Sequence, residues 1–249
     1  MTKRSRTLLL VLFAGAMVVT GAIAVRRRYD RAVETQCRNH IKQIGLGLSN
    51  YHDSYSTFPS AREGGHSWRI RLLPYMWSSP QYSVYDFDQP WDSENNITID
   101  VRPLPSKSGD LAVYGNPYGP PCDADDPHFT SYLLVVGDEA FAAPNRGRKQ
   151  SEITDGLENT IAVAEVALSS VHWISPVDLD FETMSFSIND GPRSISSCHP
   201  SGPAVLFCDG AVYRLNSGID PATVRGLCTI NGGESISRDS LVSAGLLIP

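Results

Sequence analysis

LLLVLFAGAMVVTGAIAV, residues 8–25, is an uncharged apolar run, and Arg26, Arg27 and Arg28 follow it directly. As an α-helix this run would be roughly 27 Å long, which is close to the thickness of the hydrocarbon core of a bilayer. The basic residues on both sides of the run are typical of contact with lipid head groups. We therefore expect residues 1–28 to form a basic and transmembrane or signal segment, followed by one domain at residues 29–249.

The apolar run continues into a helical pattern. Pro59 disfavours the α conformation at Phe58 and therefore predicts the end of the helix there. Gly45 and Gly47 indicate that a strand or loop crosses closely, because glycine otherwise weakens a helix. The sequence thus predicts one long helix whose second half packs against the rest of the chain. The residues of the packing face recur at intervals of three or four: Val33, Cys37, Ile41, Ile44, Leu48, Tyr51 and Tyr55.

Two interpretations of the first segment are open. Residues 1–6 are basic, residues 7–21 are apolar, and Ala22-Ile23-Ala24 has the small-x-small form of a signal-peptidase site. Against cleavage, three arginines would follow the cut at once. We favour a retained single-pass membrane anchor with an extracytoplasmic C-terminal domain, although basic residues on the two sides of the run nearly balance. The alternative is export after cleavage near Ala24.

Composition limits the class of protein. The 249 residues carry a formal charge of -6, and seven of the 21 Lys and Arg residues lie before residue 32. The remainder is therefore more acidic than the total, and a nucleic-acid partner is not expected. The 17 Pro and 20 Gly, with few periodic segments after residue 60, predict short strands joined by turns. The expected fold class is α+β, with a long N-terminal helix, inserted in a membrane over its first half, packed on an antiparallel β-sheet.

Several elements of this body can be placed. Strands are expected at residues 132–136 and 161–166, and a helix is expected after Pro90, with Asp92 or Ser93 as its N-cap. The clearest hairpin covers residues 204–215, where Asp-Gly between β-rich runs predicts a two-residue type I′ turn. Such a turn would pair Cys208 with Ala211, Phe207 with Val212 and Leu206 with Tyr213.

The residues do not predict an enzyme. If the hairpin strand is extended, His199 and Asp209 lie some 30 Å apart, at its opposite ends. Glu165 within a strand is interpreted as an exposed or Arg-paired side chain in preference to a general acid or base. The six histidines and five cysteines lack metal-ligand spacing, although some cysteines can pair outside the cytosol. No nucleophile elbow or phosphate loop occurs. We predict no catalytic residue, no metal site and no cofactor.

A family resemblance emerges from motifs that are spread along the chain. Cys37-Arg38-Asn39-His40-Ile41, Asn50-Tyr51-His52-Asp53 and Phe58-Pro59 resemble the N-terminal helix of a large bacterial family of unknown function, whose members carry a C-terminal His-x9-Asp-Gly motif. The resemblance covers residues 37 to about 234. It implies a structural role, in turns and packing, for these residues: Cys37, Trp91, Asp155, Gly156, Asn159, Thr160, Glu165, His199, Asp209 and Gly210.

Members of that family look like type IV pilins or secretion pseudopilins, in which a membrane-inserted helix packs with its second half on an antiparallel sheet. The present chain departs from the family at the leader. Gly15 and Gly21 are not followed by the usual Phe-Thr-Leu, and no acidic residue lies inside the apolar run. The resemblance therefore implies the fold more strongly than it implies processing by a prepilin peptidase.

The leading expectation for function is a non-enzymatic, membrane-anchored, pilin-like or pseudopilin-like protein of the bacterial cell envelope, acting in assembly or secretion. Its partners would be the membrane and other copies of itself or other pilin-like components. One alternative is an exported ligand-binding module, in which the loop 102–128 and the side chains of Trp68, Trp91 and Trp173 line a pocket. The other is a hydrolase assembled from His52, His199 and Glu165.

Overall fold

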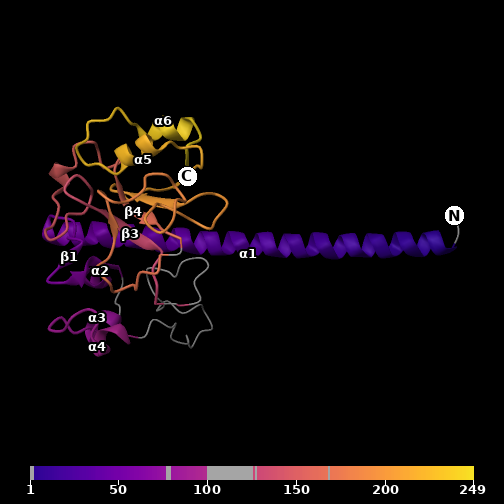
Figure 1. Cartoon of the computed structure of the whole chain (residues 1–249), viewed down its shortest axis with the longest axis horizontal. Coiled ribbons are helices and arrows are strands. Elements are labelled where there is room, and N and C mark those ends of the chain that lie inside the picture. The colour runs from indigo at the N-terminus through magenta and orange to yellow at the C-terminus, as the bar shows by residue number, and fades with distance from the viewer. Residues whose placement is uncertain (1–2, 77–79, 100–125, 127, 168) are drawn as a thin grey trace. The chain divides into compact units, whose positions relative to one another are not determined.

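The computed structural model of the chain describes residues 3–76, 80–99, 126, 128–167 and 169–249 (Figure 1). It divides into two compact units, Met1–Cys37 and Arg38–Pro249, and each is described by itself. The boundary between the two units lies nine residues after the boundary expected between residues 28 and 29. The acidic loop at residues 102–128 falls almost wholly outside the described residues, so the pocket predicted there stays a prediction.

Helix α1 is continuous from Lys3 to Tyr55. In the first unit its described side chains are exposed to a large extent, and the exposed fraction reaches 61% at Met17, 46% at Ile23 and 68% at Val25. Most side chains of the run 8–19 lie outside the described part of the chain. No helix of the described residues is long and apolar enough to cross a membrane.

In the second unit, α1 contributes one face to the core. Ile41, Ile44 and Leu48 are buried, as the spacing predicted, whereas Tyr51 is half-buried and Tyr55 is exposed. The predicted close approach of a strand or loop to the two glycines is confirmed at Gly45, whereas Gly47 is approached by side chains of a helix. A Cβ atom on Gly45 would lie 2.9 Å from Leu206 Cδ1 on a strand, and one on Gly47 would lie 2.6 Å from Met76 Cγ on a helix.

The helices after α1 are short. They are α2 (Trp68–Met76), α3 (Pro80–Val84), α4 (Glu94–Ile97), the 3-10 helix η1 (Gln150–Glu152), α5 (Pro221–Leu227) and α6 (Arg238–Ser243). Ser93 caps α4 by accepting a hydrogen bond from the Asn96 backbone N–H, which confirms one of the two predicted N-caps. The buried Asn96 side chain then bonds the backbone of Asp86 and Pro90, which fixes the preceding loop.

A six-stranded sheet forms the centre of the second unit, in the order β5-β3-β4-β6-β7-β8. Its strands are β3 (Tyr132–Val136), β4 (Ile161–Glu165), β5 (Leu179–Asp180), β6 (Ala204–Phe207), β7 (Val212–Leu215) and β8 (Leu247–Ile248), and β1 (Arg62–Glu63) pairs separately with β2 (His66–Ser67). The two strands predicted at residues 132–136 and 161–166 are thus confirmed. The sheet is mixed, because β5 runs parallel to β3, while the other pairs are antiparallel.

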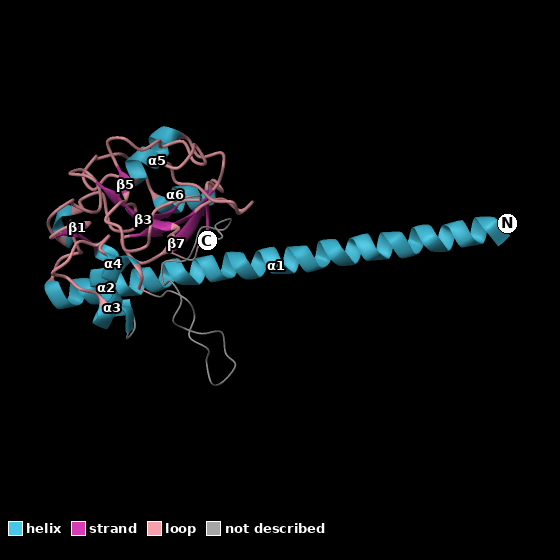
Figure 2. Ribbon diagram, turned by 60° about the horizontal axis from the view of Figure 1, so that its bottom comes forward, coloured by secondary structure: helices cyan, strands magenta, loops and turns pink. Residues whose placement is uncertain are grey.

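The sheet separates two apolar layers. Leu134 and Leu206 pack in the cluster that contains the α1 residues, whereas Leu133 and Val205 pack in the cluster that contains Val224 of α5. This alternation follows from the two-residue period of a strand. Figures 1 and 2 both show α5 on the side of the sheet opposite α1 and α2. The α+β class with a helix packed on a sheet is confirmed at this level.

The register predicted for the β6–β7 hairpin is wrong by one residue. Leu206 pairs with Val212 and Val205 with Tyr213, and the loop holds three residues, because the Phe207 N–H donates to Ala211 O. Gly210 has φ 87°, but Asp209 keeps a negative φ. A type I turn followed by a left-handed glycine has these features, whereas type I′ needs positive φ at both central positions. In this turn, Gly210 adopts the positive φ and Asp209 does not.

Candidate functional site

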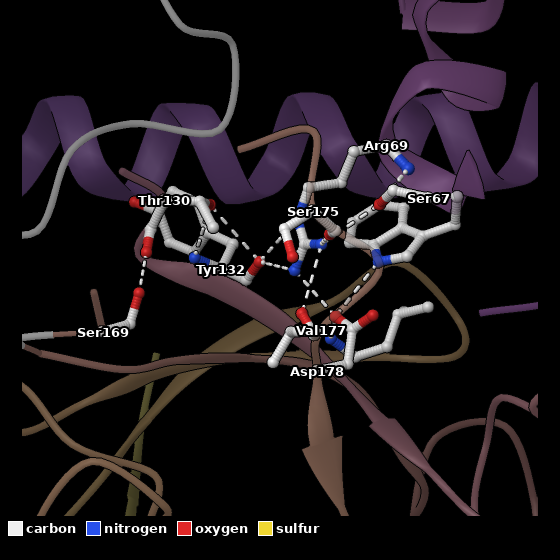
Figure 3. A network of polar contacts seen from close by, with 10 residues as sticks. Ser67, Arg69, Thr130, Tyr132, Ser169, Ser175, Val177 and Asp178 are labelled. Atoms are coloured by element: carbon white, nitrogen blue, oxygen red, sulfur yellow. Dashed lines mark hydrogen bonds and ion pairs between the residues drawn. The ribbon is translucent and has the colours of Figure 1, made fainter. Parts of the chain in front are cut away.

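A buried ion pair joins three distant segments, and Figure 3 shows its contacts. Arg69 of α2 lies 2.7 Å from Asp178, and the Asp178 side chain also accepts hydrogen bonds from Trp68 Nε1 and from the Leu134 N–H of β3. The Arg69 guanidinium donates further to Tyr132 O and Ser175 O. With so many backbone partners, Arg69 fixes α2 and the loop before β5 to the sheet. Sequence reasoning missed this pair, since its members lie far apart in the chain.

Glu165 lies at the end of β4 in a second buried cluster. Its carboxylate accepts hydrogen bonds from Ser197 Oγ at 2.6 Å and from the Ala204 N–H at 2.8 Å, and it lies 3.9 Å from Arg214 Nη1 and 4.0 Å from His199 Nε2. Burial raises the pKa of Glu165, against the effect of these donors and cations. The arrangement attaches the start of β6 to β4. The Arg-paired interpretation fits, but the exposed one does not.

The turn before β4 contacts the C-terminal segment. Asp155 accepts hydrogen bonds from the N–H groups of Gly232 and Gly233, and Asn159 Oδ1 accepts one from the Arg238 N–H. Gly156 has φ 98°, a conformation that favours glycine. Thr160 Oγ1 donates to Gly156 O or Thr229 O. These motif residues therefore set a turn and tie residues 229–238 to the sheet.

Three motif residues remain, and Asp209 lies next to the turn before β4, because its N–H donates to Leu157 O. Asp209 forms an ion pair of 2.7 Å with Arg238, at the turn of the hairpin and thus at the end opposite to His199. Trp91 is half-buried against the apolar core, with its ring 6.3 Å from the His172 ring. Cys37 lies in the first unit and is half-buried. Among the other cysteines, Cys198 is disulfide-bonded.

A cavity of about 210 Å³ opens between α1 and the β6–β7 turn, within the second unit. Its apolar walls include the rings of Phe58 and Phe141, whose centroids are 5.0 Å apart. His52, from the last turn of α1, packs on Phe58 at 4.7 Å. Residues of α1 and the Asp-Gly turn of the hairpin meet in this cavity. The full lining is Gly45, Leu48, Ser49, His52, Asp53, Phe58, Phe141, Gln150, Leu157, Ala162, Leu206, Phe207, Cys208, Asp209 and Gly210.

The residues of the two alternative functions are only partly brought together. His199 and Glu165 do lie in one cluster, but His52 is placed at the cavity, whose lining contains neither of them. Trp68 and Trp173 are fully buried. Because most of the loop 102–128 lies outside the described residues, the predicted tryptophan pocket stays a prediction. Among the described residues, no group of three or more His, Cys, Asp or Glu side chains could hold a metal ion.

The comparisons with known proteins identify the family. The model of the family described as protein of unknown function DUF1559 (SBP_bac_10) matches residues 31–187, which is more than half of the chain. The protein belongs to this family. No curated protein and no solved structure matches the chain. The matched segment ends before His199, so the Asp-Gly motif lies beyond it.

Proposed function

We propose that this protein is a non-enzymatic, membrane-anchored component of the bacterial cell envelope with a pilin-like architecture, acting in assembly or secretion. The observation that carries the proposal is the run of large apolar side chains at Met17, Ile23 and Val25, exposed on a helix that continues unbroken to Tyr55. Exposed apolar surface of this kind is stabilised by lipid or by other helices. The second half of the same helix is a core element, so the anchor and the folded domain share one element.

Two further observations support the proposal. Cys198 is disulfide-bonded, and disulfides are typical of oxidising compartments outside the bacterial cytosol. The motif residues are engaged in structural contacts, since Glu165, Asp155 and Asn159 accept hydrogen bonds from the backbone of other segments. A role in packing and turns accounts for these residues without chemistry. Partners of the helix would be the lipid bilayer and apolar helices of other copies.

The proposal is tested by fractionating cells that express the full chain and by determining the mature N-terminus. A photo-crosslinking amino acid is introduced at Ala24, which is exposed on α1, and in a control variant at Asp88, which is exposed in the second unit. We expect an intact N-terminal segment in the membrane fraction and self-adducts from position 24 but not from position 88. A soluble protein that begins at Val25 would refute anchoring, and membrane protein without adducts at position 24 would refute self-assembly through the helix.

A further inference from the structure

The cavity between α1 and the β6–β7 turn has polar side chains at its rim as well as apolar walls. His52, Asp53 and Gln150 converge there from α1 and η1, together with Ser49. Their side chains form no hydrogen bond or ion pair with other described residues, although the polar side chains nearby in the fold are bonded. A wall of apolar side chains with a few converging polar groups is the usual construction of a small-molecule site.

The charges around the cavity favour a cation. No Lys or Arg lines it among the described residues, whereas Asp53 and Asp209 do. Asp209 is neutralised by Arg238 at 2.7 Å, so Asp53 supplies the free carboxylate. The rim also includes the last turn of α1, where the carbonyl end of a helix carries a partial negative charge. The imidazole of His52 can accept a hydrogen bond from an N–H group.

The size of the cavity limits the ligand. Its volume of about 210 Å³ is below the roughly 300–1,000 Å³ of sites that take drug-sized molecules. The rings of Phe58 and Phe141 provide an aromatic wall, and Leu48 and Leu157 extend it. Aromatic walls bind apolar groups, and they also attract cations. A compact molecule with an apolar or aromatic body and one charged end matches these features.

We propose that the cavity between α1 and the β6–β7 turn binds a small organic amine, with its apolar body against Phe58 and Phe141 and its ammonium group at Asp53 and His52. This site is independent of the anchoring proposed above, because every residue that lines it lies in the second unit. Recognition of such a molecule would add a sensing or solute-binding role to a structural protein of the envelope.

The test uses the full chain in detergent micelles and three fluorinated probes of nearly equal shape, observed by ¹⁹F NMR at neutral pH. The probes are 4-fluorophenethylamine, which is a cation, 2-(4-fluorophenyl)ethanol, which is neutral, and 4-fluorophenylacetate, which is an anion. We expect saturable binding of the amine with a submillimolar dissociation constant. The alcohol and the acetate should bind at least about fivefold more weakly than the amine, which is the effect expected for loss of a partly exposed charge pair.

Three variants locate the binding. Asp53→Asn should weaken binding of the amine roughly fivefold and leave the affinity for the alcohol unchanged, because the substitution removes only the charge. Ser49→Phe, at an exposed rim position, should block binding of the amine while the thermal unfolding midpoint confirms that the variant is folded. Asp88 is another exposed carboxylate and does not line the cavity, so Asp88→Asn is the control and should bind the amine as the wild type does.

Several results would overturn the proposal. They are equal affinity for the three probes, unaltered binding by folded Ser49→Phe, the same affinity in Asp53→Asn as in the wild type, or no binding of the amine at about 10 mM. The membrane fractionation and cross-linking described above do not depend on these results. Failure of either proposal can therefore be recognised separately.

Discussion

Glu165 illustrates what a single residue does in this fold. Its side chain is 2% exposed, and it joins three segments by accepting hydrogen bonds from Ser197 and Ala204 and by lying close to Arg214 and His199. Burial raises its pKa above the ordinary value of 4.5. Removing one partner of a buried carboxylate destabilises the folded state, because the remaining buried charged and polar groups are left without compensation.

The pH dependence of stability should report on Glu165. A carboxyl whose pKa is raised in the folded state contributes stability that is fully present below the unfolded pKa, and this contribution is lost as pH rises through the folded pKa. Glu165→Gln does not titrate, so the wild type should lose stability relative to this variant as pH rises above about 4.5. Urea unfolding at a series of pH values measures the difference, and an opposite slope would contradict the assignment.

Glu152 provides the matched control for that measurement. Hydrogen bonds and the charge of Arg146 lower the pKa of Glu152 to about 2. Its contribution to stability is therefore present above the ordinary pKa and is lost as pH falls toward 2. The wild type should lose stability relative to Glu152→Gln as pH falls below the ordinary pKa of a glutamate, and not as pH rises. The effects of Glu152 and Glu165 on the free energy of unfolding can therefore be separated in the same set of unfolding curves.

At the scale of elements, the packing of α1 depends on residues that lack a side chain. Gly47 allows α2 to approach, since a Cβ atom would lie 2.6 Å from Met76 Cγ and 3.2 Å from Leu72 Cγ. Gly45 does the same for β6. The register of the hairpin depends likewise on Gly210, which adopts the positive φ that ends its turn.

Gly47→Ala should destabilise the protein by about 1–2 kcal/mol, because overpacking outweighs the roughly 1 kcal/mol that alanine gains in a helix. Met76→Ala should cost about 2–5 kcal/mol through the cavity that it leaves. The double variant should lose less than the sum of the two by at least about 1 kcal/mol, since the smaller side chain removes the overlap. Urea unfolding of all four proteins gives the coupling, and additive losses would show that α2 does not touch Gly47.

At the scale of the whole molecule, the two units differ in what holds them together. Both apolar clusters begin at Ile41 or later, so the buried core lies within Arg38–Pro249. The first unit is a helix with exposed apolar side chains among its described residues. The packing that stabilises the fold is therefore carried by the second unit.

A chain that starts at Arg38 should fold and should unfold with a free energy within about 0.5 kcal/mol of that of the full-length protein, because the truncation removes no residue that the described structure places in the buried core. Tryptophan fluorescence in urea, in the same detergent for both proteins, makes the comparison. On the anchoring that we propose, the shortened chain should also be absent from the membrane fraction. A truncated protein without a cooperative transition would show that residues before 38 are needed for the core.

The sequence alone determined the elements in which a local pattern carries the physical signal. The helical face of Ile41, Ile44 and Leu48 and the strands at 132–136 and 161–165 follow from periodicity and were predictable. The cap of α4 was predictable to one of two residues, Asp92 or Ser93. The hairpin was predictable as well, but its register was not. The choice between a two- and a three-residue loop depends on pairing along the strands, which the Asp-Gly dipeptide does not specify.

Only the tertiary structure decided which distant residues meet. Arg69 and Asp178 are separated by more than a hundred positions, and Glu165 meets His199 and Arg214 because β4 pairs with β6 and β6 with β7. The cavity between α1 and the β6–β7 turn likewise requires the helix to cross the sheet at Gly45. Such contacts arise from packing of the whole domain, because no local propensity encodes the separation of two segments in space. The apolar run at residues 8–25 is different, since its length and hydropathy alone suggested the anchor that we propose.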